Sequence, residues 1–218
     1  MYPKKKGIYL MKLVILSGSG RKESNSLKLW QFILGKFQSK ALEIELIDLC
    51  QYGSLLHHYE PLTNQQLLTE KEQLLHSLYQ CDGLIIIAPE WGGMLPPILH
   101  NTLLLTAYGS AGGFPLAHKP AFAIGVSASG GGHNPISLLK GYGAKNPHLV
   151  WLPFHLIINN IEEFLSALNV AGSNLTSREF QLVSRLEIGI EALTLYAKQL
   201  SPIRNELVTL SEKHPFGQ

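Results

Sequence analysis

The chain has 218 residues, of which 45% are apolar and only 16% are charged, which fits one large domain and excludes a disordered chain. Its 18 Lys and Arg residues against 16 Asp and Glu residues give a formal net charge of +2, too balanced to predict nucleic acid or an anionic membrane as a partner. The two cysteines, Cys50 and Cys81, form no CxxC motif and no zinc-binding pattern with histidine, so the sequence predicts a cytoplasmic protein without a metal site.

The first ten residues admit two interpretations. Lys4 to Lys6 and the apolar residues after them imitate the charged and apolar regions of a signal peptide, but Lys12 interrupts the apolar run. The glycine-rich segment that follows is better explained as a loop after a strand. The favoured interpretation therefore starts the domain at residue 11 and treats residues 1–10 as an N-terminal extension.

Short apolar runs bounded by glycine or proline alternate with helical patterns along the chain. The predicted strands are residues 13–16, 43–47, 83–88, 121–126 and 149–152. The predicted helices are residues 26–37, 65–79, 97–108, 135–140 and, after a looser segment, 178–199. This order predicts the α/β class, with a doubly wound, open, parallel five-stranded sheet in three α/β/α layers. One domain spans residues 11–200, and residues 201–218 are expected to form a C-terminal tail.

Glycine-rich polar loops follow the first, third and fourth predicted strands. Ligands of doubly wound sheets bind beyond the carboxyl ends of the strands, so these loops are expected to surround one site. The first loop, residues 17–26, offers serine hydroxyls, the Arg21 guanidinium and backbone N–H groups before a helix, which is the chemistry of a phosphate site. The other two loops, residues 89–93 and 127–132, contribute Trp91 and glycines at which a ligand can approach the backbone closely.

Three common motifs are excluded by their spacing. Gly18 and Gly20 begin a GxGxxG motif, but Glu23 stands at the third glycine position. No Gly-Lys is followed by Ser or Thr, as a Walker A loop requires, and residues 125–129 lack the final glycine of a hydrolase elbow. No Ser/His/Asp set or carboxylate pair stands out either, so no catalytic side chain is assigned.

The loops resemble those of the NADPH-dependent FMN reductases, which include quinone, azo-dye and chromate reductases and have a flavodoxin-like fold. The likeness covers residues 11–155. The family's first loop, Gly-Ser-x-Arg-x-x-Ser, is matched by Gly18, Ser19, Arg21 and Ser24. Its second loop, Pro-Glu-Tyr-Asn-Gly-Ser-x-Pro-Gly-x-Leu-Lys-Asn, is matched at Pro89, Glu90, Gly93, Pro96, Leu99 and Asn101, with departures at Trp91, Gly92, Met94, Pro97 and His100.

The resemblance implies an FMN site in the three loops. The expected cofactor-binding residues are Ser19, Arg21, Ser24, Ser26, Pro89, Glu90, Trp91, Gly92, Gly93, Ser127, Ser129, Gly130 and Gly131. The first loop is expected to hold the FMN phosphate and Trp91 to flank the flavin ring. Gly92 replaces a family asparagine and removes a side-chain amide, so weaker flavin binding is expected.

The implied function is an FMN-dependent NAD(P)H oxidoreductase. NADPH or NADH would deliver hydride to the flavin, leave, and be replaced by a quinone, an azo compound, free flavin or a similar small-molecule acceptor in a ping-pong route. The alternatives are a non-catalytic electron carrier of the flavodoxin type and a degenerate member that acts through protein contacts. A net charge of +2 does not suit the carrier, because such carriers are usually strongly acidic.

The predicted helix at residues 97–108 contains no charged side chain. A helix that is apolar all round is normally buried, whereas a helix flanking an open sheet should keep one face in water. We therefore expect a second subunit to cover this face, giving a homodimer or homotetramer, as family members also form.

Overall fold

The computed structural model describes residues 10–37, 42–57, 65–107, 109–110, 113–145, 147–169 and 175–215. All of its strands run parallel in one sheet, in the order β2-β1-β3-β4-β5, and β6 also pairs with β4. The strands are β1 (Met11–Ser17), β2 (Leu42–Asp48), β3 (Gly83–Pro89), β4 (Pro120–Val126), β5 (Val150–Trp151) and β6 (Leu156–Ile158). The order reverses direction between β1 and β3, so the predicted doubly wound, flavodoxin-like sheet is confirmed.

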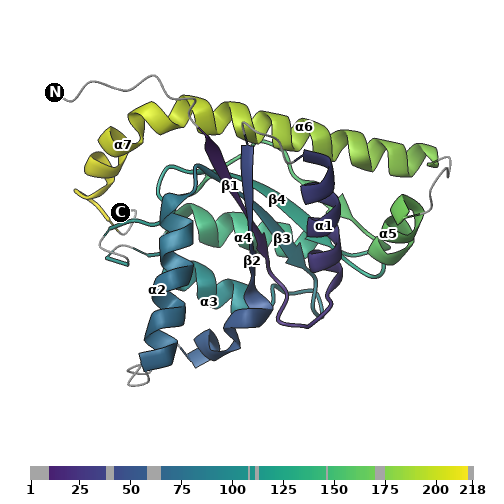
Figure 1. The fold of residues 1–218 in the computed structure, drawn as a ribbon, viewed down its shortest axis with the longest axis horizontal. Helices are drawn as coiled ribbons and strands as arrows, with labels where there is room; N and C mark the ends of the chain where they lie inside the picture. The colour runs from purple at the N-terminus through teal and green to yellow at the C-terminus, as the bar shows by residue number, and fades with distance from the viewer. Residues whose placement is uncertain are drawn as a thin grey trace.

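Helices cover both faces of the sheet, as the ribbon in Figure 1 shows. The helices are α1 (Asn25–Phe37), α2 (Gln65–Gln80), α3 (Pro97–Leu105), α4 (His133–Lys145), α5 (Ile161–Asn169), α6 (Ser177–Leu200) and α7 (Arg204–Ser211), with 3-10 segments η1 (Leu49–His57) and η2 (Ser201–Ile203). The two core clusters separate them, with α1, α5 and α6 on one face and α2, α3 and α4 on the other. The three predicted layers are therefore present.

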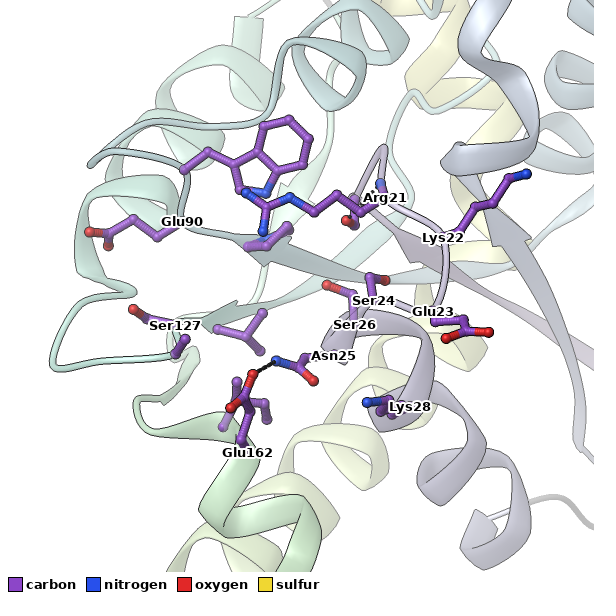
Figure 2. A pocket seen from close by; sticks show the side chains of 16 residues that line it. Arg21, Lys22, Glu23, Ser24, Asn25, Ser26, Lys28, Glu90, Ser127 and Glu162 are labelled. Atoms are coloured by element: carbon purple, nitrogen blue, oxygen red, sulfur yellow. Dashed lines mark hydrogen bonds between the residues drawn. The ribbon is translucent and has the colours of Figure 1, made fainter.

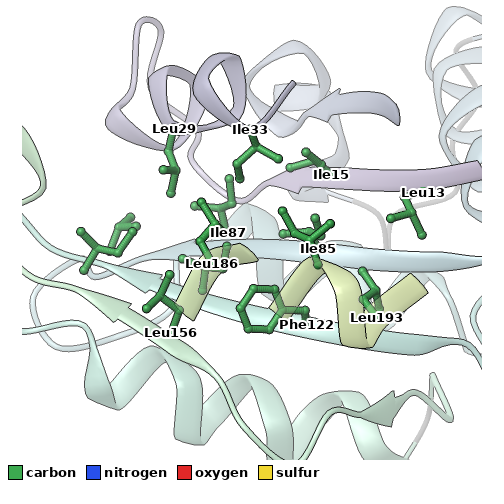
Figure 3. Packing of buried hydrophobic residues seen from close by; sticks show 14 of the residues in the cluster. Leu13, Ile15, Leu29, Ile33, Ile85, Ile87, Phe122, Leu156, Leu186 and Leu193 are labelled. Atoms are coloured by element: carbon green, nitrogen blue, oxygen red, sulfur yellow. The ribbon is translucent and has the colours of Figure 1, made fainter. Parts of the chain in front are cut away.

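Alternate residues of the central strands fill these two cores. Leu13 and Ile15 of β1 belong to the cluster under α1 and α6, whereas Val14 and Leu16 belong to the cluster on the opposite face. Both faces of the sheet are buried, which explains why β1 and β3 are apolar at successive positions. Figure 3 shows the first cluster, in which Phe122 of β4 lies among side chains from β1, β3 and α6.

The long helix α6 packs closely on the sheet, and a glycine makes this possible. A Cβ atom on Gly189 would lie 2.3 Å from the Phe122 ring. The helix begins with a capping box, in which the Thr176 side chain accepts from the Glu179 amide and the Glu179 carboxylate accepts from the Thr176 amide. These two features fix where α6 starts and how near it lies to β4.

The edge of the sheet beside β4 is formed by two short strands instead of the one predicted strand. The expected strand at residues 149–152 is a two-residue strand, β5, and the chain returns to the edge of β4 as β6. The segment 153–155 between them leaves the ladder at Pro153, which has no amide hydrogen to donate. Helix α5, which follows β6, was not predicted.

The helix boundaries also differ at two places. Helix α4 extends beyond the predicted residues 135–140 at both ends, and α3 ends at Leu105, while Tyr108 lies outside the described residues. Residues 201–211 of the expected C-terminal tail are helical, as η2 and α7. The extension predicted at residues 1–10 lies outside the described part of the chain except for Leu10. In the described ranges, no helix has both the length and the apolar character that crossing a bilayer requires.

Candidate functional site

A pocket of about 260 Å³ lies at the carboxyl ends of β1, β3 and β4, beside the point where the strand order reverses. This is the place where open α/β sheets bind ligands. Its walls come from the three predicted loops and from the start of α5, as Figure 2 shows. The lining residues are Ser19, Arg21, Lys22, Glu23, Ser24, Asn25, Ser26, Lys28, Pro89, Glu90, Trp91, Val126, Ser127, Ala128, Ile161 and Glu162.

The first loop presents the N-terminus of α1 to this pocket. The Ser24 hydroxyl accepts from the Leu27 amide at 3.2 Å and so caps the helix. Ser26, in the first turn, is 1% exposed, and its hydroxyl contacts no hydrogen-bond partner in the described chain. A buried hydroxyl without a partner is costly in a folded protein, and because Ser26 lines the pocket, its hydroxyl can hydrogen-bond to a ligand there.

The second loop is a tight turn built on two glycines. Trp91 and Met94 exchange backbone hydrogen bonds of 3.0 and 3.1 Å, and the central residues Gly92 and Gly93 have φ values of 57° and 81°. Positive φ at both central positions is what such a turn requires, and glycine supplies it without strain. The replacement at Gly92 therefore keeps the turn, and its expected effect on flavin binding stays a prediction.

This turn places the Trp91 indole against the first loop. The Arg21 guanidinium lies 4.7 Å from the centre of the indole ring, within the range of a cation–π contact. A Cβ atom on Gly20 would lie 3.7 Å from the same ring. Arg21 and Trp91 thus form one side of the pocket together.

The third loop is fixed by Glu90 and by β6. The Glu90 carboxylate accepts a hydrogen bond from the Gly132 amide, and a Cβ atom on Gly131 would overlap that carboxylate at 2.5 Å. On the other side, the Ser127 amide donates to the Ile158 carbonyl at 3.1 Å. A side chain at position 131 would therefore displace the Glu90 carboxylate from its present place.

The predicted residues divide into two groups. Eight line the pocket: Ser19, Arg21, Ser24, Ser26, Pro89, Glu90, Trp91 and Ser127. The other five lie in the same loops but not in its wall: Gly92, Gly93, Ser129, Gly130 and Gly131. In the described ranges, no group of three or more His, Cys, Asp or Glu side chains is arranged to hold a metal.

The sequence prediction missed several lining residues. Lys22, Asn25 and Lys28 belong to the first loop and the first turn of α1, where the phosphate pattern itself could have indicated them. Ile161 and Glu162 begin α5, directly after β6, and could have been found only by recognising Leu156–Ile158 as the strand that precedes them.

Comparison with known proteins identifies the family. The sequence profile of the NADPH-dependent FMN reductases matches residues 11–160. The chain belongs to this family. It is accordingly an enzyme of the NAD(P)H-dependent FMN reductase type, with FMN as cofactor and NADPH or NADH as reductant. No curated protein matches the chain.

Solved structures show the same fold at low sequence identity. The flavoenzyme NAD(P)H:acceptor oxidoreductase FerB from Paracoccus denitrificans is 19% identical, with a TM-score of 0.57 over 87% of this chain and 98% of that one. An oxidoreductase from Corynebacterium diphtheriae is 13% identical, with a TM-score of 0.59 over 91% and 98%. The NADH:FMN oxidoreductase EmoB is 17% identical, with a TM-score of 0.54 over 87% and 90%.

The residues of the pocket fit FMN. The buried Ser26 hydroxyl, which has no partner within the described ranges, and the N-terminus of α1 suit a phosphate, which accepts several hydrogen bonds and carries negative charge. The indole of Trp91 offers a flat apolar surface beside them.

Proposed function

We propose that this FMN-dependent NAD(P)H oxidoreductase reduces a small diffusible acceptor, such as a quinone, an azo compound or free flavin. In this proposal the first loop holds the FMN phosphate, and the flavin ring lies beside Trp91 and the third loop. The observation that carries the proposal is Ser26 at the N-terminus of α1, a residue that is 1% exposed and whose hydroxyl has no hydrogen-bond partner in the part of the chain that the structure describes.

Each loop has a separate task in this proposal. FMN, when bound, supplies the redox chemistry by accepting hydride from NAD(P)H and passing electrons to the acceptor. Ser24 and Ser26 offer hydroxyls to the phosphate, while Arg21, stacked on Trp91, joins the phosphate end to the ring end. Glu90 holds the third loop in place through the Gly132 amide.

The size of the pocket supports an exposed flavin ring. Pockets for ligands of this size typically measure about 300–1,000 Å³, whereas this pocket measures about 260 Å³. We infer that it encloses the phosphate end of FMN and leaves the flavin ring accessible beside Trp91.

Reductant and acceptor then reach the same face of the flavin in turn, so steady-state assays are expected to give parallel double-reciprocal lines. Intersecting lines would contradict this order.

The decisive experiment measures flavin binding directly. Purified protein mixed with FMN and passed through a desalting column should be yellow and should bleach when NADPH is added. Arg21→Ala is expected to weaken FMN binding about tenfold or more, because a hydrogen bond to a charged group contributes about 1.5–3 kcal/mol.

Arg185→Ala is the matched control for this experiment. It removes the same charge from α6, where Arg185 donates to the His155 carbonyl at 3.3 Å and does not line the pocket. FMN binding by this variant is expected to equal that of the wild type. A colourless protein that FMN cannot reconstitute would remove the proposal, and equal losses in the two variants would remove the role of Arg21.

We also propose that a second copy of the chain covers the outer face of α3. Five residues of α3 are buried within the subunit: Ile98, Leu99, Thr102, Leu103 and Leu105. Its outer side carries no charge, and beside it Met94 is 56% exposed and Tyr142 is 41% exposed. The His100 ring stacks on Tyr142 at 4.6 Å, which makes α3 and α4 one continuous surface. Sedimentation at micromolar concentration should give a dimer or tetramer, and a monomer of 24.1 kDa would contradict it.

A cytoplasmic location completes the proposal. Cys50 and Cys81 are both free thiols, and Cys81 is buried. Unpaired cysteines are usual in a reducing compartment. Fractionation of cells that express the chain should recover it with the cytoplasmic proteins.

A further inference from the structure

A carboxylate lies in the part of the pocket assigned to the phosphate. Glu162, in the first turn of α5, lines the pocket together with Ser24 and Ser26. Its Oε1 atom accepts a hydrogen bond of 3.2 Å from the Asn25 side-chain amide, drawn as the dashed line in Figure 2. Asn25 is the first residue of α1, so the carboxylate stands at the helix N-terminus that the phosphate would use.

The pocket is lined by charged side chains of both signs, and the charge of Glu162 would act on a bound phosphate. Arg21, Lys22 and Lys28 contribute positive charge, and Glu23, Glu90 and Glu162 contribute negative charge. The carboxylate of Glu90 is directed to the Gly132 amide, whereas that of Glu162 meets the Asn25 side chain. A phosphate at the α1 N-terminus would therefore share the pocket with the negative charge of Glu162, and two negative charges in one pocket repel each other.

Stabilisation of α5 alone does not account for Glu162. An acidic residue in a first turn stabilises its helix, and Glu163 on the same turn is available for that purpose. Glu163 is exposed and does not line the pocket. Glu162 also lies beyond residues 11–160, the part of the chain that matches the family profile. Its position in the pocket is thus known from this structure and not from the family match.

We propose that Glu162 is a specificity-determining residue that weakens binding of the flavin phosphate and so reduces the preference for FMN over riboflavin. The proposal rests on the proposed function, because it requires the phosphate to lie in the first loop. When FMN binds, the Glu162 side chain leaves Asn25 and turns to solvent, which frees the Asn25 amide to donate to the phosphate. Riboflavin carries no phosphate and is not repelled.

The test compares two single-charge variants of neighbouring residues. Glu162→Gln removes the charge but keeps an oxygen that can accept from Asn25, so the contact between α1 and α5 is preserved. Glu163→Gln removes the same charge from the same helix turn outside the pocket. Dissociation constants for FMN and for riboflavin are measured by quenching of flavin fluorescence at low ionic strength.

Glu162→Gln is expected to bind FMN about fivefold more tightly than the wild type, which corresponds to about 1 kcal/mol, and to bind riboflavin equally well. Inorganic phosphate should compete with FMN more effectively in this variant. The gain should shrink as salt is added, because Glu162 is exposed and its charge is screened. Glu163→Gln should match the wild type for both flavins.

Two results would overturn the proposal alone. One is an unchanged FMN affinity in Glu162→Gln, in a protein whose FMN binding depends on Arg21. The other is an equal gain for riboflavin, which would show that the effect does not act through the phosphate. If instead Arg21→Ala leaves FMN binding unchanged and the wild type binds both flavins equally, the phosphate placement fails and this proposal fails with it.

Discussion

At the amino ends of the strands, buried charged groups contact protein partners, whereas at the carboxyl ends two buried hydroxyls have none in the described chain. Lys119 is 3% exposed and donates to the carbonyls of Leu78 and Tyr79, each at 2.6 Å. Asp82 is 5% exposed and pairs with Arg204 at 3.7 Å. At the opposite end, Ser17 and Ser26 are 0% and 1% exposed, and neither hydroxyl has a hydrogen-bond partner among the described residues.

We infer that the buried polar groups at the amino ends of the strands stabilise the fold, whereas those at the carboxyl ends bind a ligand. The contacts of Lys119 and Asp82 close the C-terminal end of α2 and attach η2 and α7 to the sheet, so their loss should unfold the protein more easily. The Ser26 hydroxyl makes no hydrogen bond within the described ranges, so its loss should affect the ligand instead. Substitutions at the two ends therefore test the comparison directly.

The largest effect is expected for Lys119→Met. The variant leaves two carbonyls at the end of α2 without their donor, which should lower the free energy of unfolding by about 2 kcal/mol at neutral pH. Urea denaturation measures this loss, and FMN affinity should stay at the wild-type value. A variant as stable as the wild type, or one that loses FMN affinity in proportion to its stability, would show that Lys119 does not act on stability alone.

The same substitution has a pH signature. Burial lowers the pKa of Lys119 from 10.5 to about 8. Between these values the unfolded chain holds more protons than the folded chain, so this group's contribution to the free energy of unfolding rises with pH. The difference in stability between wild type and Lys119→Met should therefore widen from pH 8 to 10.5. Burial also raises the pKa of the Cys81 thiol, which acts in the opposite direction, and Lys119 at 3.9 Å opposes that rise. The variant lacks this opposition, so Cys81 should widen the difference further.

A smaller effect, on binding rather than stability, is expected for Ser26→Ala. FMN affinity should fall about fivefold, which corresponds to the 1 kcal/mol of one hydrogen bond. The melting temperature should not fall, because the hydroxyl has no hydrogen bond to lose among the residues that the structure describes. Ser24→Ala provides the contrast, since it removes the helix cap as well and should lower both affinity and stability. A destabilised Ser26→Ala protein would refute the distinction between the two ends.

The smallest effect is expected at His118, which lies just before the amino end of β4 and contacts α7. Its Nε2 atom lies 2.7 Å from the Ser211 hydroxyl, and burial, followed by the nearby His148, lowers its pKa below 6.5. Below pH 6.5 the unfolded chain binds more protons than the folded chain, so stability is lost as the pH falls through this range.

His118→Gln should reduce that loss by less than about 1 kcal/mol. Thermal melts between pH 5 and 7 measure it. The reduction should be partial, because burial also lowers the pKa of His155 and this group remains. An acid-induced loss that is unchanged in the variant would show that His118 does not contribute.

The central part of the fold could be predicted from the sequence because its signals are local. β1, β3 and β4 are mostly apolar runs followed by glycine, serine or proline. Because both faces of these strands are buried, nearly every residue in them is apolar, and the runs stand out in the sequence. The first two loops were identified from residue types at fixed spacing, and eight predicted residues line one pocket.

The remainder depends on contacts between distant residues. β6 has three residues, too few for a periodic pattern, and it is defined by pairing with β4. Glu162 meets Asn25 although 137 positions separate them, so no local pattern placed it in the site. Arg204, 122 positions from Asp82, similarly attaches a segment that was expected to be a tail.

The break between β5 and β6 divides one edge of the sheet into two independently anchored parts. β5 is in register with Pro120 and Ala121, and β6 with Ile124 to Val126, while residues 153–155 lie between them without strand pairing. A change in the length of this connection can be absorbed where it occurs, since each part keeps its own pairing with β4. The entry of α5 into the pocket, and Glu162 with it, is thereby protected from insertions and deletions upstream, so evolution can alter the outer edge of the sheet without altering the charge beside the N-terminus of α1.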